Sequence, residues 1–385
     1  TVPTKGIPND EFVRVVRADP KRKGLLYAGT EKGVWVSFDD GDNWSKLQLN
    51  LPPVPIHDLA VKNDNLIAAT HGRSFWLIDD LTPLHQINSE LIGKETVLFK
   101  PMPSYRMAGS NKRDAKLEGE NHPNGVMIHY FLKKADEQTV VRLDILESDG
   151  DTIRTFSNKA KDKADQLTVQ AGGGRFVWDM RYPGYKTFPG MVFYGSPNLG
   201  PKAVPGIYKV RLTVNGQSQT QEFEILKDPR LTTTPADFQA QFDFLMKVRN
   251  KVTEANESIL NIRKIKDDLG YLKKKMGDDP KNKEINEAIK KFEDELKTIE
   301  NDIHQTKNSS VQDPLNYGIR LNNRLAHLMI EQAQGDFRPT KQGEAVRENV
   351  SKLIDNELGK LTMVIGTNLQ KINQMAKEKG VLFVN

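Results

Sequence analysis

The residues of this sequence with the clearest chemical potential are aspartates in short turns. Asp39 stands in the pattern Ser-x-Asp-x-Gly-x-x-Trp, whose fixed positions are Ser37, Asp39, Gly41 and Trp44. The pair Asp79–Asp80 follows 40 residues after the pair Asp39–Asp40. Hydrolysis of a glycosidic bond needs two carboxyl groups that face each other across the sugar, about 5–10 Å apart. Adjacent residues of a strand point to opposite sides, so the two acids of either pair cannot act together, and we assign no catalytic residue.

The same pattern has a structural interpretation, which we favour. The Asp39 carboxylate can accept hydrogen bonds from backbone N–H groups of its own turn, and Gly41 can take the positive φ that the turn requires. Trp44 would then fold back over apolar side chains. Because such a turn satisfies its polar groups locally, we expect a structural role for these residues. Hydrogen bonds within the turn would stabilise a hairpin at Ser37, Asp39, Gly41 and Trp44.

A second group of residues could bind a ligand. His71 and Arg73 lie 40 residues after Glu31 and Gly33, in a turn between two predicted strands, and Trp76 follows. A cation beside an aromatic ring could receive an acidic or sugar ligand. The alternative, which we favour, is that Arg73 forms a hydrogen-bonded pair with a neighbouring repeat.

Residues 182–206 form a segment with five Pro, five Gly and no strand periodicity. Long irregular segments are often functional, so its aromatic residues are candidate binding residues: Tyr185, Phe188, Phe193 and Tyr194. The alternative, which we favour, is that the segment packs against the neighbouring N-terminal domain and so holds the two domains together.

Motifs for metals and cofactors are missing from the sequence. Cys is absent, which excludes disulfides, thiolate zinc sites, iron–sulfur clusters and cysteine nucleophiles. The seven His form no H-E-x-x-H set, and no nucleophile elbow, P-loop, dinucleotide-binding glycine pattern or twelve-residue calcium loop occurs. We therefore expect neither a metal nor a cofactor.

The elements that carry these residues begin with short strands separated by turns, over residues 1–95. The stretch Leu26–Thr30 matches Leu66–Thr70 at an offset of 40 residues, and Asp39–Asp40 matches Asp79–Asp80 at the same offset. A period of about 40 residues with several short strands is typical of a β-propeller blade. The sequence predicts two such blades.

A linker at residues 96–109 and a second β-rich region at residues 110–228 follow. In the predicted strand 206–214, the side chains of Tyr208, Val210, Leu212 and Val214 alternate onto one face. Strands at this spacing, with the Asn215–Gly216 turn between the last two, predict an Ig-like β-sandwich.

Residues 231–385 are predicted to be helical. Thr234–Asp237 is a helix start signal, and apolar residues recur at steps of three and four as far as Met276, before Gly277. Further helices are predicted around Ile285–Ile303, from Asp313–Pro314 onward, and after Pro339. Four antiparallel helices with short links predict a four-helix bundle.

Composition excludes several function classes. The chain has 385 residues, of which 37% are hydrophobic and 28% charged, so it can form several packed domains. Its net charge is only +5, and the surplus is spread along the chain, whereas nucleic-acid-binding proteins concentrate it on one face. No apolar run reaches the roughly 18 residues of a membrane-spanning helix. We expect neither nucleic-acid binding nor a membrane span.

The repeats and motifs resemble a known family. Ser-x-Asp-x-Gly-x-x-Trp is the Asp-box, and Asp-boxes in such repeats are similar to the BNR-repeat propellers of sialidases, xyloglucanase-like glycosidases and sortilin. The segments Phe12–Pro20, Gly24–Thr30 and Ala69–Trp76 resemble the last blades of large bacterial sortilin-like, BNR-repeat "glycosyl hydrolase" proteins. Those proteins are similar in order too, with propellers before an Ig-like domain and a helical tail. Trp178–Asp179 and Pro205–Tyr208 resemble the flagellar hook-capping type of Ig-like domain.

This resemblance implies an extracytoplasmic bacterial protein, which is periplasmic, on the cell surface or secreted. A propeller typically has four to eight blades, so the remaining blades would come from a companion polypeptide, the N-terminal part of the same precursor. The alternative is a small sheet that is complete by itself.

For function, we expect a non-catalytic binding or architectural region that binds protein or glycan. The alternative is the C-terminal part of a glycoside hydrolase, xyloglucanase-like or sialidase-like, whose catalytic acids lie in missing N-terminal blades. A cell-surface adhesin would use the same domains.

Overall fold

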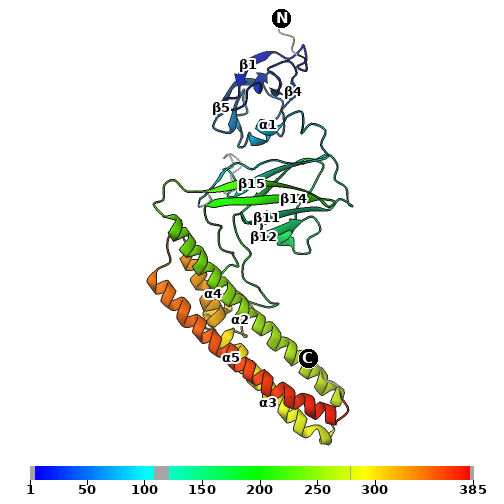
Figure 1. Ribbon diagram of the computed structural model, residues 1–385, viewed down its shortest axis with the longest axis vertical. Coiled ribbons are helices and arrows are strands. Elements are labelled where there is room, and N and C mark those ends of the chain that lie inside the picture. The colour runs from blue at the N-terminus through cyan, green and yellow to red at the C-terminus, as the bar shows by residue number, and fades with distance from the viewer. Residues whose placement is uncertain (1–4, 108–120, 278, 382–385) are drawn as a thin grey trace. The chain divides into compact units, whose positions relative to one another are not determined.

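The structure is a computed structural model that describes residues 5–107, 121–277 and 279–381. The N-terminal part is rich in β-strands and the C-terminal part is helical (Figure 1). The chain divides into two compact units, Thr1–Asp179 with Gly206–Lys227, and Met180–Pro205 with Asp228–Asn385. The parts of the predicted domains at residues 1–4, 108–120, 278 and 382–385 lie outside the described residues.

Two antiparallel sheets open the first unit. The strands of the first sheet, in spatial order, are β1 (Val13–Ala18), β2 (Leu26–Thr30), β3 (Val34–Ser37) and β4 (Ser45–Lys46). Those of the second sheet are β5 (Ile56–Lys62), β6 (Asn65–Thr70) and β7 (Phe75–Ile78). The matching stretches at residues 26–30 and 66–70 are therefore corresponding strands, β2 and β6.

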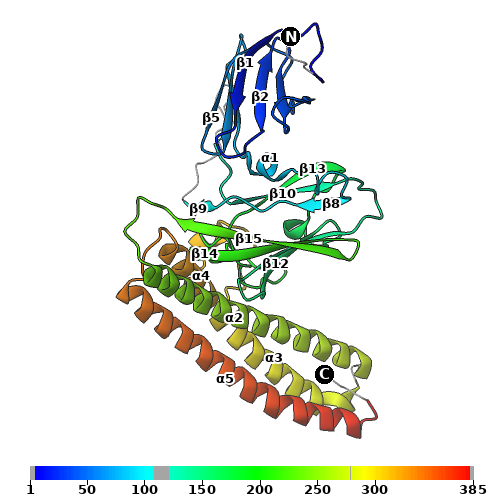
Figure 2. The same cartoon turned by 45° about the horizontal axis from the view of Figure 1, so that its top comes forward.

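The first two sheets pack against each other through apolar side chains. Tyr27, Val34 and Val36 of the first sheet share one buried cluster with Leu59 and Leu66 of the second. Figure 2 shows β1 and β2 beside β5. The second sheet differs from the first in having three strands, because the chain continues from β7 into the short helix α1 (Thr82–Gln86).

The remaining strands of the first unit form two more sheets. One has the order β13-β10-β8 and the other β12-β11-β14-β15-β9. Their bounds are β8 (Thr96–Leu98), β9 (Ser104–Arg106), β10 (Val126–Leu132), β11 (Val141–Leu146), β12 (Thr152–Ser157), β13 (Gly172–Trp178), β14 (Gly206–Val214) and β15 (Gln217–Lys227), with a 3-10 turn η1 (Lys163–Asp165). The ring of Trp178 contacts Tyr208 and Phe223 of the other sheet edge-on.

The alternation predicted for residues 206–214 is present, since Tyr208, Val210 and Leu212 are buried in β14. The predicted linker contains two strands. β8 and β9 lie within the range 96–109, and they pair with β10 and β15. A three-residue strand is too short to show a period of two in the sequence.

The described residues of the second unit form four α-helices around one apolar core. They are α2 (Pro235–Met276), α3 (Lys283–Ile303), α4 (Leu321–Gln332) and α5 (Lys341–Glu378), with 3-10 turns η2 (Pro280–Asn282) and η3 (Asp313–Leu315). α2 begins as predicted, because Thr234 and Asp237 form a reciprocal capping box. The helix expected from Asp313–Pro314 begins later, at Leu321. Residues 313–315 form only η3, and Arg320 is extended (φ −105°, ψ −176°).

The segment Met180–Pro205 belongs to this helical unit. Tyr185 and Phe188 are buried in the core that α2–α5 share. The sequence analysis did not predict this packing into the helical core, because it considered only the first domain as the surface that the segment covers. The aromatic composition of the segment indicates burial correctly, but does not say which apolar surface it covers.

Candidate functional site

The Ser37–Trp44 turn is held by hydrogen bonds within itself. The Ser37 hydroxyl donates to Oδ1 of Asp39 (2.8 Å) and accepts from the backbone N–H of Gly41 (2.9 Å). Gly41 has a φ of 98°, a conformation that favours glycine. Trp44 donates from its indole N–H to the Gly41 carbonyl (2.9 Å), and it is partly buried against the small core cluster that contains Trp35.

The Asp39 carboxylate is engaged at both oxygens. Oδ2 accepts from the side-chain amide of Asn43 (2.7 Å), and Oδ1 accepts from the Asn43 backbone N–H (2.9 Å) as well as from Ser37. These donors, the Asn43 side chain first, lower the pKa of Asp39. The arrangement stabilises the ionised form of the carboxylate, and both of its oxygens are used in hydrogen bonds within the turn.

His71, Arg73 and Trp76 lie together at the turn between β6 and β7. The Arg73 guanidinium donates to the carbonyl of its neighbour Gly72 (3.1 Å), and the Trp76 indole donates to the carbonyl of Arg73 (2.9 Å). The His71 ring stacks on His57, with centroids 5.1 Å apart. Within the described part of the chain, Arg73 is exposed and makes no pair with another repeat, so its cation is open to solvent.

Of the four aromatic candidates in residues 182–206, three face the helical core. Tyr185 and Phe188 are buried there, and Phe193 is partly buried against it. Burial raises the pKa of Tyr185 to about 12, and its hydroxyl donates to the Ser196 carbonyl (2.9 Å). Tyr194 is 45% exposed. Only Tyr194 of this group is available to a ligand.

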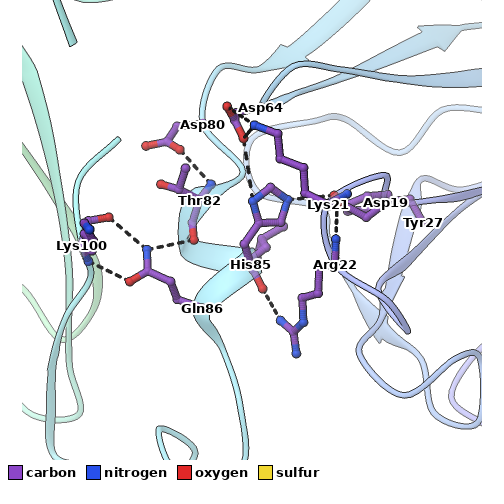
Figure 3. Close-up of polar contacts among 11 residues, drawn as sticks. Asp19, Lys21, Arg22, Tyr27, Asp64, Asp80, Thr82, His85, Gln86 and Lys100 are labelled. Atoms are coloured by element: carbon purple, nitrogen blue, oxygen red, sulfur yellow. Dashed lines mark hydrogen bonds and ion pairs between the residues drawn. The ribbon is translucent and has the colours of Figure 1, made fainter. Parts of the chain in front are cut away.

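The structure also brings together a polar cluster that the sequence analysis missed (Figure 3). Its centre is Asp19, which follows β1 and whose side chain is fully buried. Oδ2 of Asp19 accepts from the Tyr27 hydroxyl (3.0 Å) and lies 2.9 Å from Nε2 of His85 in α1. Oδ1 accepts from the backbone N–H groups of Lys21 (2.8 Å) and Arg22 (3.0 Å).

The charge state of this centre follows from its surroundings. Burial acts to raise the pKa of Asp19, but the contact with His85 and the donors Lys21 and Tyr27 outweigh it and lower the pKa. Burial, together with the Asp19 carboxylate, raises the pKa of Tyr27 far above its usual range. Asp19 is therefore ionised and Tyr27 protonated at neutral pH.

A second carboxylate connects this cluster to the next sheet. Asp64, in the turn between β5 and β6, pairs with the Lys21 ammonium at 2.7 Å. Its Oδ1 also lies 3.8 Å from Nδ1 of His85. The Arg22 guanidinium donates to the carbonyl of Leu84 in α1. The corresponding turns of the first two sheets are thus linked through α1.

The same helix is linked to the strands that follow it. Asp80 accepts from the backbone N–H of Thr82 (2.8 Å), and its other oxygen lies 3.2 Å from Nε2 of His129 in β10. Burial acts to raise the pKa of Asp80, but His129 and Thr82 outweigh it and lower the pKa. Gln86 exchanges two hydrogen bonds with the backbone of Lys100 (Figure 3).

These contacts indicate that the cluster is structural. A general acid or base must reach a substrate proton, whereas both ring nitrogens of His85 face carboxylates and its side chain is only 15% exposed. Among the described residues, no group of three or more His, Asp or Glu could hold a metal ion. Sequence motifs did not reveal the cluster, because its members are spread from Asp19 to His129.

No family model matches the chain, and no curated protein matches it. Among solved structures, the extracellular domain of a putative one-component system from B. thetaiotaomicron aligns with 12% identity and a TM-score of 0.16 over 58% of this chain. This chain covers 26% of that one, about a quarter of its length. A structure described as pT26-6p aligns with 10% identity and a TM-score of 0.14, over 92% of this chain and 68% of that one. Scores this low carry no argument about fold or function.

No helix among the described residues is long and apolar enough to span a membrane.

Proposed function

We propose that this chain is a non-catalytic binding or architectural region of a larger, extracytoplasmic, sortilin-like β-propeller protein of a bacterium, with protein or glycan as its ligand. In this proposal the first two sheets are propeller blades, the next two sheets are an Ig-like sandwich, and α2–α5 are a four-helix bundle.

The observation that carries the proposal is the repetition of one strand arrangement. β2 pairs with β3 so that Leu26 lies opposite Ser37, and β6 pairs with β7 so that Leu66 lies opposite Ile78. Each sheet begins with a further antiparallel strand, β1 or β5. Repeated antiparallel sheets that pack face to face are the architecture of a propeller.

The Ser37–Trp44 turn supports the same proposal. An Asp-box has a structural role if its carboxylate accepts hydrogen bonds from residues of its own turn. Asp39 accepts three such hydrogen bonds, two from Asn43 and one from Ser37. The Asp19 carboxylate is likewise bonded within the fold. These acids stabilise blades in our proposal and do not act on a substrate.

A propeller of at least four blades would need more sheets than the two described here. The proposal therefore includes a companion polypeptide, the N-terminal part of the same precursor, that supplies the remaining blades.

Binding and hydrolysis assays on the full chain test this function. We expect binding to a panel of glycans and envelope proteins, with no release of sugar from β-glucans or sialosides. Arg73→Ala shows whether the exposed cation contributes to binding, and Lys62→Ala is a control that removes a charge from the same sheet. Turnover by this chain that is lost on substitution of one of its carboxylates would establish the competing function, a glycoside hydrolase.

A further inference from the structure

The second sheet exposes large apolar side chains on one face. Phe75 is 75% exposed and Leu77 is 51% exposed, both on β7. Their cross-strand partners on β6, Ala69 and Ile67, are also partly exposed. Together they form a continuous apolar patch, which we call the β7 face. Large exposed apolar patches commonly mark interaction sites.

The first sheet contains the equivalent residues, and there they are buried. Val36 lies opposite Tyr27 just as Leu77 lies opposite Ile67. Val34 lies opposite Gly29 just as Phe75 lies opposite Ala69. Val34 and Val36 are only 3% and 4% exposed. The same position in the repeat is thus covered in one sheet and open in the other.

The molecule itself shows what covers this position. Tyr27, Val34 and Val36 pack against Leu59 and Leu66, which belong to the second sheet. The first sheet is therefore covered by the next sheet of the repeat. The same packing, applied once more, places a third sheet on the β7 face.

The edge of β7 agrees with this arrangement. β3 is paired on both sides, with β2 and β4, whereas β7 pairs only with β6 among the described strands. An unpaired edge strand can accept a further strand through its backbone N–H and C=O groups. The second sheet thus has a vacant place where the first sheet has β4.

We infer that the β7 face is the docking surface for another β-sheet repeat of the same kind, and that this partner also pairs with the edge of β7. The inference rests on the proposed function, because the partner is the companion polypeptide proposed above. It adds the surface that the companion contacts, which is the β7 face, and the type of contact, which is packing of sheet on sheet with strand pairing at the edge of β7.

Thiol labelling tests this inference, because the chain has no Cys and an introduced thiol is its only one. Leu77→Cys reports on the β7 face. Val140→Cys is the matched control, because Val140 is 46% exposed and lies outside the first two sheets. Both variants are made in the gene of the organism that produces the protein. Labelling is compared between the assembly isolated from those cells and the separated chain.

We expect both thiols to react at similar rates in the separated chain. In the assembly we expect Leu77→Cys to react at least about tenfold more slowly, while Val140→Cys is unchanged. A thiol-linked photo-crosslinker on Leu77→Cys should attach to a β-strand segment of the companion.

If a companion is present and Leu77→Cys reacts as in the separated chain, the inference is wrong while the proposed function stands. If the crosslink reaches a helical segment or a second copy of this chain, the assigned partner is wrong. If the chain is isolated alone and Leu77→Cys is reactive, both the inference and the companion are wrong.

Discussion

Nε2 of His85 lies 2.9 Å from the buried Oδ2 of Asp19, although the two residues are 66 positions apart in the sequence. The same oxygen accepts the Tyr27 hydroxyl. One carboxylate therefore joins α1 to the turn after β1 and to β2. This contact joins the first sheet to α1, and the ion pair between Lys21 and Asp64 adds the turn between β5 and β6 of the second sheet.

Replacing Asp19 tests that role. Asp19→Ala leaves two backbone donors, the Tyr27 hydroxyl and His85 without their acceptor, so we expect a loss of about 3–5 kcal/mol in the free energy of unfolding of the first unit. Asp58→Ala is the matched control, because Asp58 forms a surface pair with Arg17 and should cost no more than about 1 kcal/mol. Denaturant unfolding measures both. Equal losses would show that the buried cluster has no special role.

The Ser37–Trp44 turn gives a second prediction. Asp39→Ala removes the acceptor for the Asn43 and Ser37 donors, so we expect a lower melting temperature with ligand binding retained. Asp42→Ala in the same turn is the control. An Asp39→Ala protein that melts normally but no longer binds ligand would show that Asp39 contacts the ligand.

The segment Met180–Pro205 gives a third prediction. Phe188 is buried in the helical core, so Phe188→Ala should destabilise the helical unit by about 3–5 kcal/mol. Tyr194→Ala, at an exposed aromatic residue of the same segment, should cost little. The temperature at which each variant loses its helical circular dichroism measures the two effects. A normal transition for Phe188→Ala would mean that the segment is not part of the helical unit.

Acidification should weaken the same unit through His304. Burial first, and the nearby Arg263 charge second, lower the pKa of His304 to about 4, against the raising effects of Asn322 and Glu300. The unfolded chain therefore binds more protons between pH 6.5 and 4. The stability that His304 contributes is complete above about pH 6.5 and falls as the pH drops toward 4, by up to about 3 kcal/mol.

Unfolding of the wild type and of His304→Asn at pH 7 and pH 4.5 measures this effect. The variant should lose less stability than the wild type between the two values, because other groups that titrate in this range are common to both. An identical loss in the two proteins would show that His304 does not titrate as described.

Local patterns in the sequence predicted a large part of the fold. The 40-residue offset located β2 and β6, alternation located the buried face of β14, and Thr234–Asp237 located the start of α2. These features depend on neighbouring residues, which is why they are visible in a single sequence.

Features that depend on distant residues were not predictable in this way. The Asp19–His85 contact joins segments with no shared motif. Phe188 could be recognised as an apolar residue in an irregular segment, but its contact with His304 depends on how α3 folds back on α2. The exposed state of Arg73 likewise depends on whether another repeat lies beside it.

An electron cryo-microscopy structure of the assembly isolated from the producing cells tests most directly whether the first two sheets belong to a larger set of repeated sheets. We predict further antiparallel sheets that continue from the second sheet, with Phe75 and Leu77 buried against the next one. An assembly in which β7 faces solvent, with no additional sheet, would contradict that claim.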